Sequence, residues 1–244
     1  MTEDFNSKKM PTHAASRSFR GSPGIGILVS AEILLLGFVV AAAITRSWAE
    51  IVIPALLVVG ALVPALLEIG FRAWFPVWMH GFYIGFLLAG PFAGGRLGFY
   101  GIWDPWDKVI HASSGLLVGF AVIFAFGVIG RRYLLAFPPF LLTAGILTTG
   151  GFIAAAWEIA EYSSDHLLGT LAQNASLEDT MTDIICGVAG ATAVAITMSI
   201  HHKGHRLPLI DSLLRDRDFD SIAPATQDTM VPAETPPVMD AGED

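Results

Sequence analysis

Six apolar stretches, each long enough to cross a lipid bilayer, dominate this sequence. A bilayer core about 30 Å thick is crossed by roughly 20 residues of α-helix. Strands of a membrane barrel would show runs of about ten residues with alternating polarity, whereas these stretches are continuously apolar. The sequence therefore predicts an all-α, polytopic membrane protein with about six transmembrane helices in one bundle. The stretches lie near 24–45, 50–70, 76–95, 107–129, 135–162 and 178–200.

Lys and Arg residues are divided unequally between the two sides of this predicted bundle. Eleven lie in segments on the side of the N-terminus and three lie on the other side. Because basic residues are retained on the cytoplasmic side of a membrane, both termini are expected in the cytoplasm. The eleven are Lys8, Lys9, Arg17, Arg20, Arg72, Arg131, Arg132, Lys203, Arg206, Arg215 and Arg217, and the three are Arg46, Arg96 and Lys108.

Polar ends divide the chain into three regions. Residues 1–22 and 203–244 are polar, the latter with nine acidic residues, and both are expected to be disordered cytoplasmic tails. Between them, residues 23–202 form the six-helix transmembrane domain, and a weak signal marks a short helix around 209–214. The first apolar run exceeds the core of a signal peptide, so it is expected to stay as the first transmembrane helix. The formal net charge of −8 leaves no basic surface for nucleic acid.

Ionisable residues gather at the ends of three of the predicted helices. On the predicted topology, all of these ends lie at the outer leaflet, and spacings of three or four place each group on one helix face. An ionisable side chain costs about 2.5–3.5 kcal/mol at the centre of a membrane helix, so a convergence of them suggests a functional site. The groups are Asp107, Lys108 and His111, then Glu158 and Glu161, then Asp179 and Asp183.

Carboxylates held close together repel one another and need a compensating positive charge. A divalent cation, protonation of the acids, or the cations Lys108 and Arg96 could supply it. With oxygen ligands, one imidazole and only one cysteine in the chain, a metal would be Mg²⁺, Mn²⁺, Ca²⁺ or Zn²⁺ in a mixed site rather than a thiolate centre. The candidate metal ligands are His111, Glu158, Glu161, Asp179 and Asp183.

Several functions are compatible with such a site. It could bind a cation or the polar head group of an envelope lipid, with Lys108 and Asp107 as the head-group residues and Lys108 meeting a phosphate. As an enzyme it would be a metal-assisted hydrolase or transferase acting on envelope lipid, with His111, Glu158 or Glu161 as candidate catalytic groups, and none of the three is assigned.

Three alternatives remain open beside the binding site. A small ion- or proton-coupled transporter would need polar groups continuing across the bundle, to Glu32 in the first helix and His80 in the third. A non-catalytic membrane scaffold would use the acidic patch for docking. A structural polar network would need only charges solvated at the interface or paired with one another.

Three short motifs in these segments resemble a known family. Together they are similar to the YjdF-like family of uncharacterised bacterial integral membrane proteins, and the first motif also resembles the start of a helix in VanZ-like proteins. The resemblance covers residues 50–200 and implies a six-helix bundle in a bacterial cytoplasmic membrane, but no reaction. After His111 the chain has Ala112 instead of the family's usual aromatic residue. The motifs are Trp106-Asp107-Lys108 with His111 and Gly115, Trp157-Glu158 with Glu161-Tyr162, and Asp179-Thr180 with Asp183.

Overall fold

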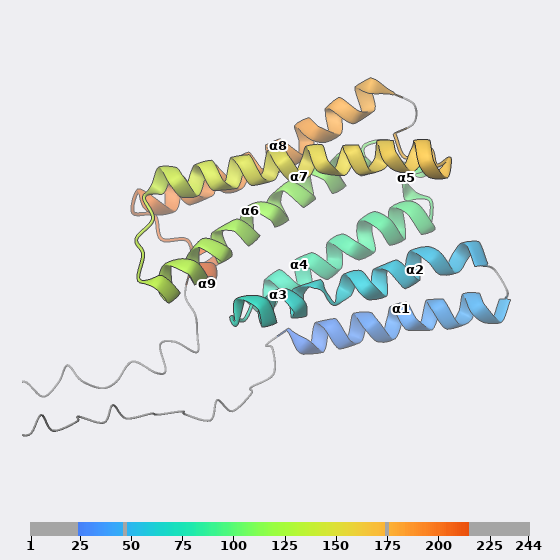
Figure 1. The fold of residues 1–244 in the computed structure, drawn as a ribbon, viewed down its shortest axis with the longest axis horizontal. Helices are drawn as coiled ribbons and strands as arrows, with labels where there is room; N and C mark the ends of the chain where they lie inside the picture. The colour runs from blue at the N-terminus through green and yellow to red at the C-terminus, as the bar shows by residue number, and fades with distance from the viewer. Residues whose placement is uncertain (1–23, 46–47, 174–175, 215–244) are drawn as a thin grey trace, which may run out of the picture.

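The computed structural model describes residues 24–45, 48–173 and 176–214 (Figure 1). The predicted tail at 1–22 and the part of the second tail from 215 onward lie outside these residues. All regular secondary structure in the described ranges is helical, and six helical segments are long and apolar enough to span a membrane, as predicted. The elements are α1 (Ile25–Thr45), α2 (Trp48–Ala61), α3 (Val63–Phe71), α4 (Val77–Leu87), the π-helix η1 (Leu88–Arg96), α5 (Phe99–Ile102), α6 (Trp106–Tyr133), α7 (Pro139–Leu168), α8 (Leu177–His202) and α9 (Pro208–Leu214).

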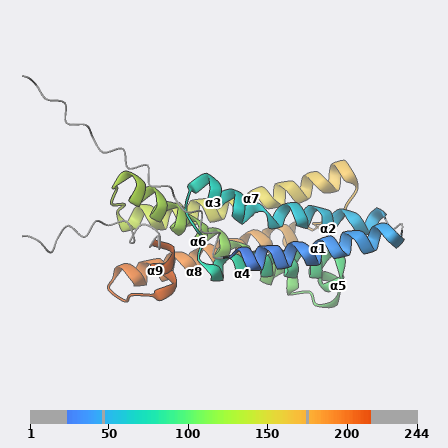
Figure 2. The ribbon, with the colours of Figure 1, turned by 90° about the horizontal axis from the view of Figure 1, so that it is seen from below.

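The spans form two groups of three that lie against each other (Figures 1 and 2). The first group packs α1, α2 and α4 around a core that includes Leu35, Leu57 and Ile84. The second packs α6, α7 and α8 around a larger core that includes Ile123 and Met198. Large apolar side chains cover the outside of both groups, as a lipid environment requires.

The second and third spans are each built from two helical pieces. α2 gives way to α3 at Leu62, and Pro64 occupies the first turn of α3, where its missing N–H costs little. In the third span, α4 widens into η1, which contains Pro91. Proline cannot donate the regular helical hydrogen bond, and π-type widening is one way in which a helix accommodates such a disruption. Sequence periodicity predicted both spans as single helices, without these breaks.

Local signals set the ends of the long helices around the candidate site. α6 begins after Pro105, with Asp107 in its first turn and Arg131 and Arg132 in its last turn, the arrangement that the helix dipole favours. α7 begins at Pro139 and ends at Leu168, and the next residue, Gly169, has a φ of 69°, which suits glycine best. At the start of α8, the Ser176 side chain accepts a hydrogen bond from the Asp179 N–H.

Glycines allow α6 and α8 to approach each other at backbone contact. A methyl group on Gly115 would overlap the carbonyl oxygen of Gly187, and a methyl group on Gly190 would overlap the carbonyl oxygen of Ala112. No side chain other than hydrogen fits at either position without separating the helices. This close crossing brings the first turn of α6 against the first two turns of α8.

A short helix follows the last span and packs on the bundle. Ile210 and Leu213 of α9 are fully buried in the larger core, and Trp78 of α4 donates a hydrogen bond of 2.9 Å to Ser212 Oγ. The short helix expected around 209–214 is thereby confirmed. Residues 208–214, which the sequence analysis assigned to the second tail, are therefore helical, and they bury the apolar side chains of Ile210 and Leu213.

Candidate functional site

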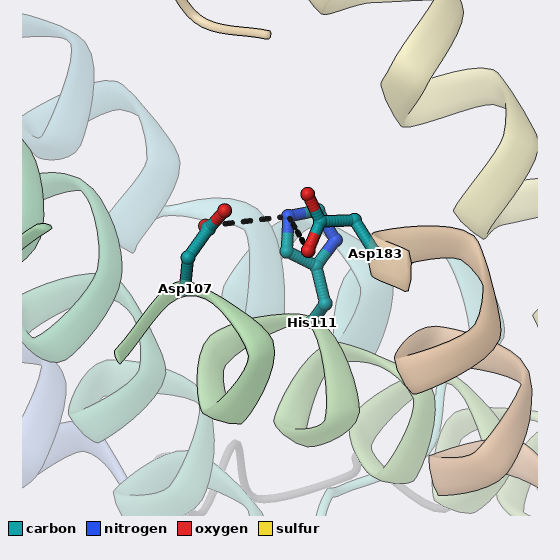
Figure 3. Close-up of side chains that lie close together, drawn as sticks. All are labelled: Asp107, His111 and Asp183. Atoms are coloured by element: carbon teal, nitrogen blue, oxygen red, sulfur yellow. Dashed lines mark ion pairs between the residues drawn. The ribbon is translucent and has the colours of Figure 1, made fainter. Parts of the chain in front are cut away.

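Asp107 and His111 of α6 and Asp183 of α8 meet at the end of the bundle opposite α9 (Figures 1 and 3). His111 Nε2 lies 3.5 Å from Asp107 Oδ1 and 4.0 Å from Asp183 Oδ1. One ligand atom from each of the three residues falls within 4.8 Å of the others. His111 and Asp183 are buried and Asp107 is partly buried, so most of the surface of these three side chains is covered by the protein.

The second nitrogen of the imidazole faces a third carboxylate. His111 Nδ1 lies 3.9 Å from Glu158 Oε1 on α7, and the Glu158 residue is only 3% exposed. On its other side, Glu158 accepts hydrogen bonds from Gln173 Nε2, which lies 3.1 Å from the Glu158 carbonyl oxygen and 3.4 Å from Oε2. His111 therefore stands between carboxylates from all three helices of the second group.

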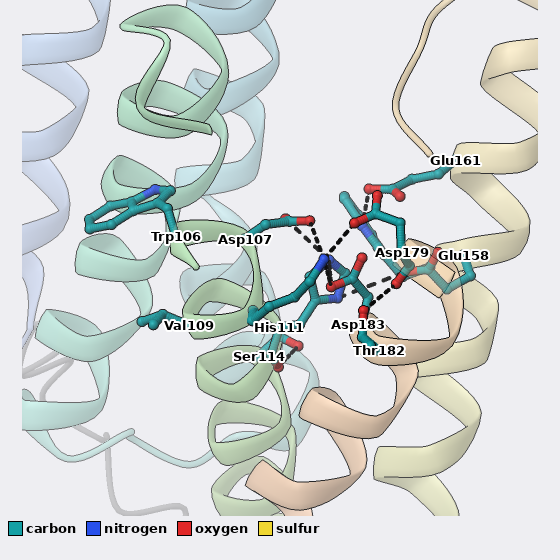
Figure 4. A network of polar contacts seen from close by, with 12 residues as sticks. Trp106, Asp107, Val109, His111, Ser114, Glu158, Glu161, Asp179, Thr182 and Asp183 are labelled. Atoms are coloured by element: carbon teal, nitrogen blue, oxygen red, sulfur yellow. Dashed lines mark hydrogen bonds and ion pairs between the residues drawn. The ribbon is translucent and has the colours of Figure 1, made fainter. Parts of the chain in front are cut away.

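Lys108 links α6 to α8 beside the histidine. Its Nζ lies 2.6 Å from Asp179 Oδ1, 2.9 Å from Asp183 Oδ1 and 3.5 Å from Asp107 Oδ2. Figure 4 shows the carboxylates of Asp107, Asp179 and Asp183 converging on this region. The lysine is thus the cation that balances part of the acidic charge.

At this centre, two buried carboxylate oxygens have no hydrogen-bond partner among the described residues. They are Glu158 Oε1 and Asp183 Oδ1, the same two atoms that lie nearest the ring nitrogens of His111 from α7 and α8. Asp183 Oδ1 nevertheless forms an ion pair of 2.9 Å with Lys108 Nζ, so the ammonium compensates its charge. An unsatisfied buried oxygen costs about 1–3 kcal/mol, or more when charged, so a missing partner is expected at Glu158 Oε1.

Other sequence-predicted site residues lie at the edge of this group. Asp179 forms its ion pair with Lys108. Glu161 accepts a hydrogen bond of 2.7 Å from Trp157 Nε1 on its own helix. The structure therefore brings Asp107, His111 and Asp183 together most closely, with Glu158 behind the imidazole, while Glu161 and Asp179 lie farther out (Figure 4).

Two residues near the site have roles that sequence reasoning missed. Gln173 is held in place because Asp165 accepts hydrogen bonds from the N–H groups of Ala172 and Gln173 and from the Thr170 hydroxyl. Tyr100 of α5 lies near the acidic group, and partial burial, with the charges of Asp107 and other site carboxylates, raises the pKa of its phenol. The sequence analysis gave neither residue a role in the site.

A separate polar pair lies in the other half of the bundle. His80 Nε2 is 3.2 Å from Glu68 Oε1, which also accepts a hydrogen bond from the Phe75 N–H. The His80 ring packs edge-on to the ring of Phe75, a member of the larger core. Glu32 of α1 lies apart from both groups, and neither of its carboxylate oxygens has a hydrogen-bond partner among the described residues.

This arrangement defines a multi-pass membrane protein with a buried acidic and histidine centre at one end of its helices. A family described as "Predicted membrane protein (DUF2238)" matches residues 27–204, and the chain belongs to this family. The matched range covers all but the first two residues of the six spans and every residue of the centre. The comparison with curated proteins and the comparison with solved structures each gave no significant match.

Proposed function

We propose that this protein binds a divalent cation through Asp107, His111 and Asp183. The observation that carries the proposal is the position of the His111 imidazole, whose Nε2 faces two carboxylates while its Nδ1 faces a third. Metal-bound histidines commonly hold a metal with one nitrogen and give the other N–H to a carboxylate, which fixes the ring and raises its basicity. Glu158 has the position of that orienting carboxylate.

The distances favour a shared ion over direct hydrogen bonds. Hydrogen bonds between an imidazole and a carboxylate lie at about 2.7–3.2 Å, and the His111 distances of 3.5, 3.9 and 4.0 Å all exceed this range. Two ligand atoms that bind one ion at about 2.0–2.2 Å can be separated by at most about 4.4 Å. The two Nε2 separations therefore fit one cation that His111 shares with Asp107 and Asp183.

The ligand types narrow the choice of metal. Carboxylate oxygens suit Mg²⁺, Ca²⁺ and Mn²⁺, whereas an imidazole suits Zn²⁺ and other later transition metals. Two carboxylates with one imidazole therefore point to Mn²⁺ or Zn²⁺, with the remaining coordination positions open to water or a substrate oxygen. A cation bound in this way would act as a Lewis acid toward a phosphate or carbonyl oxygen.

The transporter alternative has less support because the polar groups do not continue through the described bundle. Between His111 and the pair of Glu68 and His80 lies an apolar core that includes Ile123 and Phe124. Phe124 is 13 residues beyond His111 on the same helix, which corresponds to about 20 Å of helix. A cation site at one end of the helices explains the clustered carboxylates without a pathway.

The proposal includes an orientation. The sequence assigns eleven of fourteen basic residues to segments on the side of the termini, so we place the centre at the outer leaflet of a bacterial cytoplasmic membrane. The resemblance of the three motifs to a bacterial inner-membrane family supports the same location.

Cation binding is tested by equilibrium dialysis of the full-length protein in detergent against Mn²⁺. The protein is expected to retain about one Mn²⁺ per chain, and Asp183→Asn is expected to weaken binding at least tenfold. Glu178→Gln removes one carboxylate from the same helix at an exposed position, so it is the matched control and should bind as the parent does. Equal binding by the parent and by Asp183→Asn would sink the proposal.

A further inference from the structure

A groove of about 700 Å³ lies between α7 and α8, beneath the segment that joins them. Ala155, Glu158 and Ile159 line it from α7, and Thr180 and Ile184 line it from α8. Its volume falls in the range of about 300–1,000 Å³ that is typical of small-molecule pockets. The walls are mainly apolar, and Glu158 is the residue that the groove shares with the His111 centre.

The rim of the groove is suited to the hydrocarbon of a bilayer. Ile159, Leu171 and Leu177 line it and are 65%, 78% and 77% exposed. Exposed apolar side chains around a pocket mark a site for an apolar partner, and in a membrane-spanning helix pair that partner is lipid. The groove therefore opens toward acyl chains.

The polar groups of the groove include two carboxylates beside hydroxyl, amide and imidazole groups. Besides Glu158, the groove is lined by Asp165, whose oxygens accept hydrogen bonds from the joining segment and hold Gln173 against Glu158. Glu158 is 3% exposed and keeps one oxygen without a hydrogen-bond partner among the described residues. Two carboxylates, with His166 as the basic residue of the lining, favour a ligand that brings a positive charge.

We propose that this groove binds one phospholipid with an amine-bearing head group. One acyl chain lies along Ala155, Ile159 and Ile184, and the ammonium lies at the acidic end formed by Glu158 and Asp165. The apolar walls supply affinity for the chain, and the two carboxylates supply selectivity for the amine. This lipid site goes beyond the proposed cation centre and does not require a bound cation.

Native mass spectrometry of the full-length protein in detergent tests the lipid site. The probes are palmitoyl-oleoyl phosphatidylethanolamine and palmitoyl-oleoyl phosphatidylglycerol, which have the same chains and differ in the head group. The parent protein is expected to retain one phosphatidylethanolamine, and at least tenfold less phosphatidylglycerol at the same concentration. Equal retention of the two lipids would overturn the assignment of an amine head group.

Variants that fill the groove test its location. Ala155→Trp and Ile184→Trp each add an indole to the groove wall, and both are expected to reduce phosphatidylethanolamine retention at least tenfold. Ile153→Trp adds the same ring to α7 at a position that is 40% exposed and outside the groove, so it should retain the lipid. Unchanged retention in both groove variants would overturn the proposal.

Mn²⁺ binding by the same proteins separates this proposal from the first. A groove variant that loses lipid but keeps Mn²⁺ is folded and supports the lipid site. A parent protein that retains the lipid without binding Mn²⁺ would leave the lipid site standing and remove only the cation site.

Discussion

Replacing Gly190 by alanine should separate α6 from α8 and weaken both the fold and the proposed cation site. The new methyl carbon would overlap the Ala112 carbonyl oxygen and would lie 2.9 Å from the Leu116 nitrogen. Both atoms belong to the backbone, so no side-chain rotation can relieve the contact. The helices must therefore move apart, by roughly 1–1.5 Å if the methyl group is to reach ordinary contact distance.

The expected loss follows from two opposing effects. Overpacking typically lowers the free energy of unfolding by about 1–3 kcal/mol, and the upper end applies here because the new methyl group overlaps backbone atoms. The better helix propensity of alanine returns at most about 1 kcal/mol. We therefore expect the free energy of unfolding to fall by about 2 kcal/mol. The separation between His111 Nε2 and Asp183 Oδ1, now 4.0 Å, would exceed the span of one ion, so Mn²⁺ affinity should fall at least tenfold.

Equilibrium unfolding in mixed micelles with increasing dodecyl sulfate, followed by tryptophan fluorescence, measures this loss. Gly85→Ala is the control, because no described atom outside its own helical surroundings lies within 4 Å of the methyl position. That variant should be as stable as the parent or slightly more stable. If Gly190→Ala matched Gly85→Ala in stability and in Mn²⁺ binding, the close crossing would not be what holds the site together.

Three further outcomes are expected. Lys108→Met removes an ammonium that is 2.9 Å from Asp183 Oδ1. In the absence of Mn²⁺, the free energy of unfolding should therefore fall by about 3 kcal/mol, while the affinity for Mn²⁺ should rise at least tenfold. A fall in affinity on dialysis would show that Lys108 supports the bound cation. Glu68→Ala leaves His80 and the Phe75 N–H without their shared acceptor. The free energy of unfolding in dodecyl sulfate should fall by about 2–4 kcal/mol, with Mn²⁺ binding unchanged. Altered Mn²⁺ binding would mean that the two ends of the bundle are coupled. A green fluorescent protein fused after Leu214 should fluoresce in a bacterial host, whereas alkaline phosphatase fused there should be inactive, and the reverse result would invert the proposed orientation.

The sequence was sufficient to predict the spans and the residues that cluster, for reasons that depend on local chemistry. Span length follows from bilayer thickness, and each of the six apolar stretches coincides with a helical segment of the structure. Spacings of four place Asp107 with His111 and Asp179 with Asp183 on one face of a helix whatever the rest of the fold does. The cost of burying charge then requires those faces to meet partners.

The division of roles within the cluster could not be predicted from spacing. Which carboxylate meets Lys108 depends on the rotation of α8 about its axis, and that rotation is set by the contacts of Gly187 and Gly190 with α6. Glu158 and Glu161 lie on one stripe of α7, yet only Glu158 turns toward His111, while Glu161 bonds to Trp157. These outcomes depend on tertiary packing, which one sequence does not encode in its local pattern.

Irregular backbone was also missed. A proline inside an apolar run can begin, kink or widen a helix, and the choice in η1 depends on neighbours such as Trp106, whose Nε1 donates to the Ala89 carbonyl oxygen. Gln173 was missed for a similar reason, because its position depends on the hydrogen bonds that Asp165 makes to a segment with no periodicity of its own.

The most direct test of the cation centre is electron spin-echo envelope modulation of Mn²⁺ bound to the full-length protein. The proposed ligand set predicts modulation from one imidazole nitrogen, which should disappear in His111→Gln while Glu178→Gln keeps it. Bound Mn²⁺ without nitrogen modulation, or with modulation that survives in His111→Gln, would contradict the assignment of His111 as a ligand and with it the proposed centre.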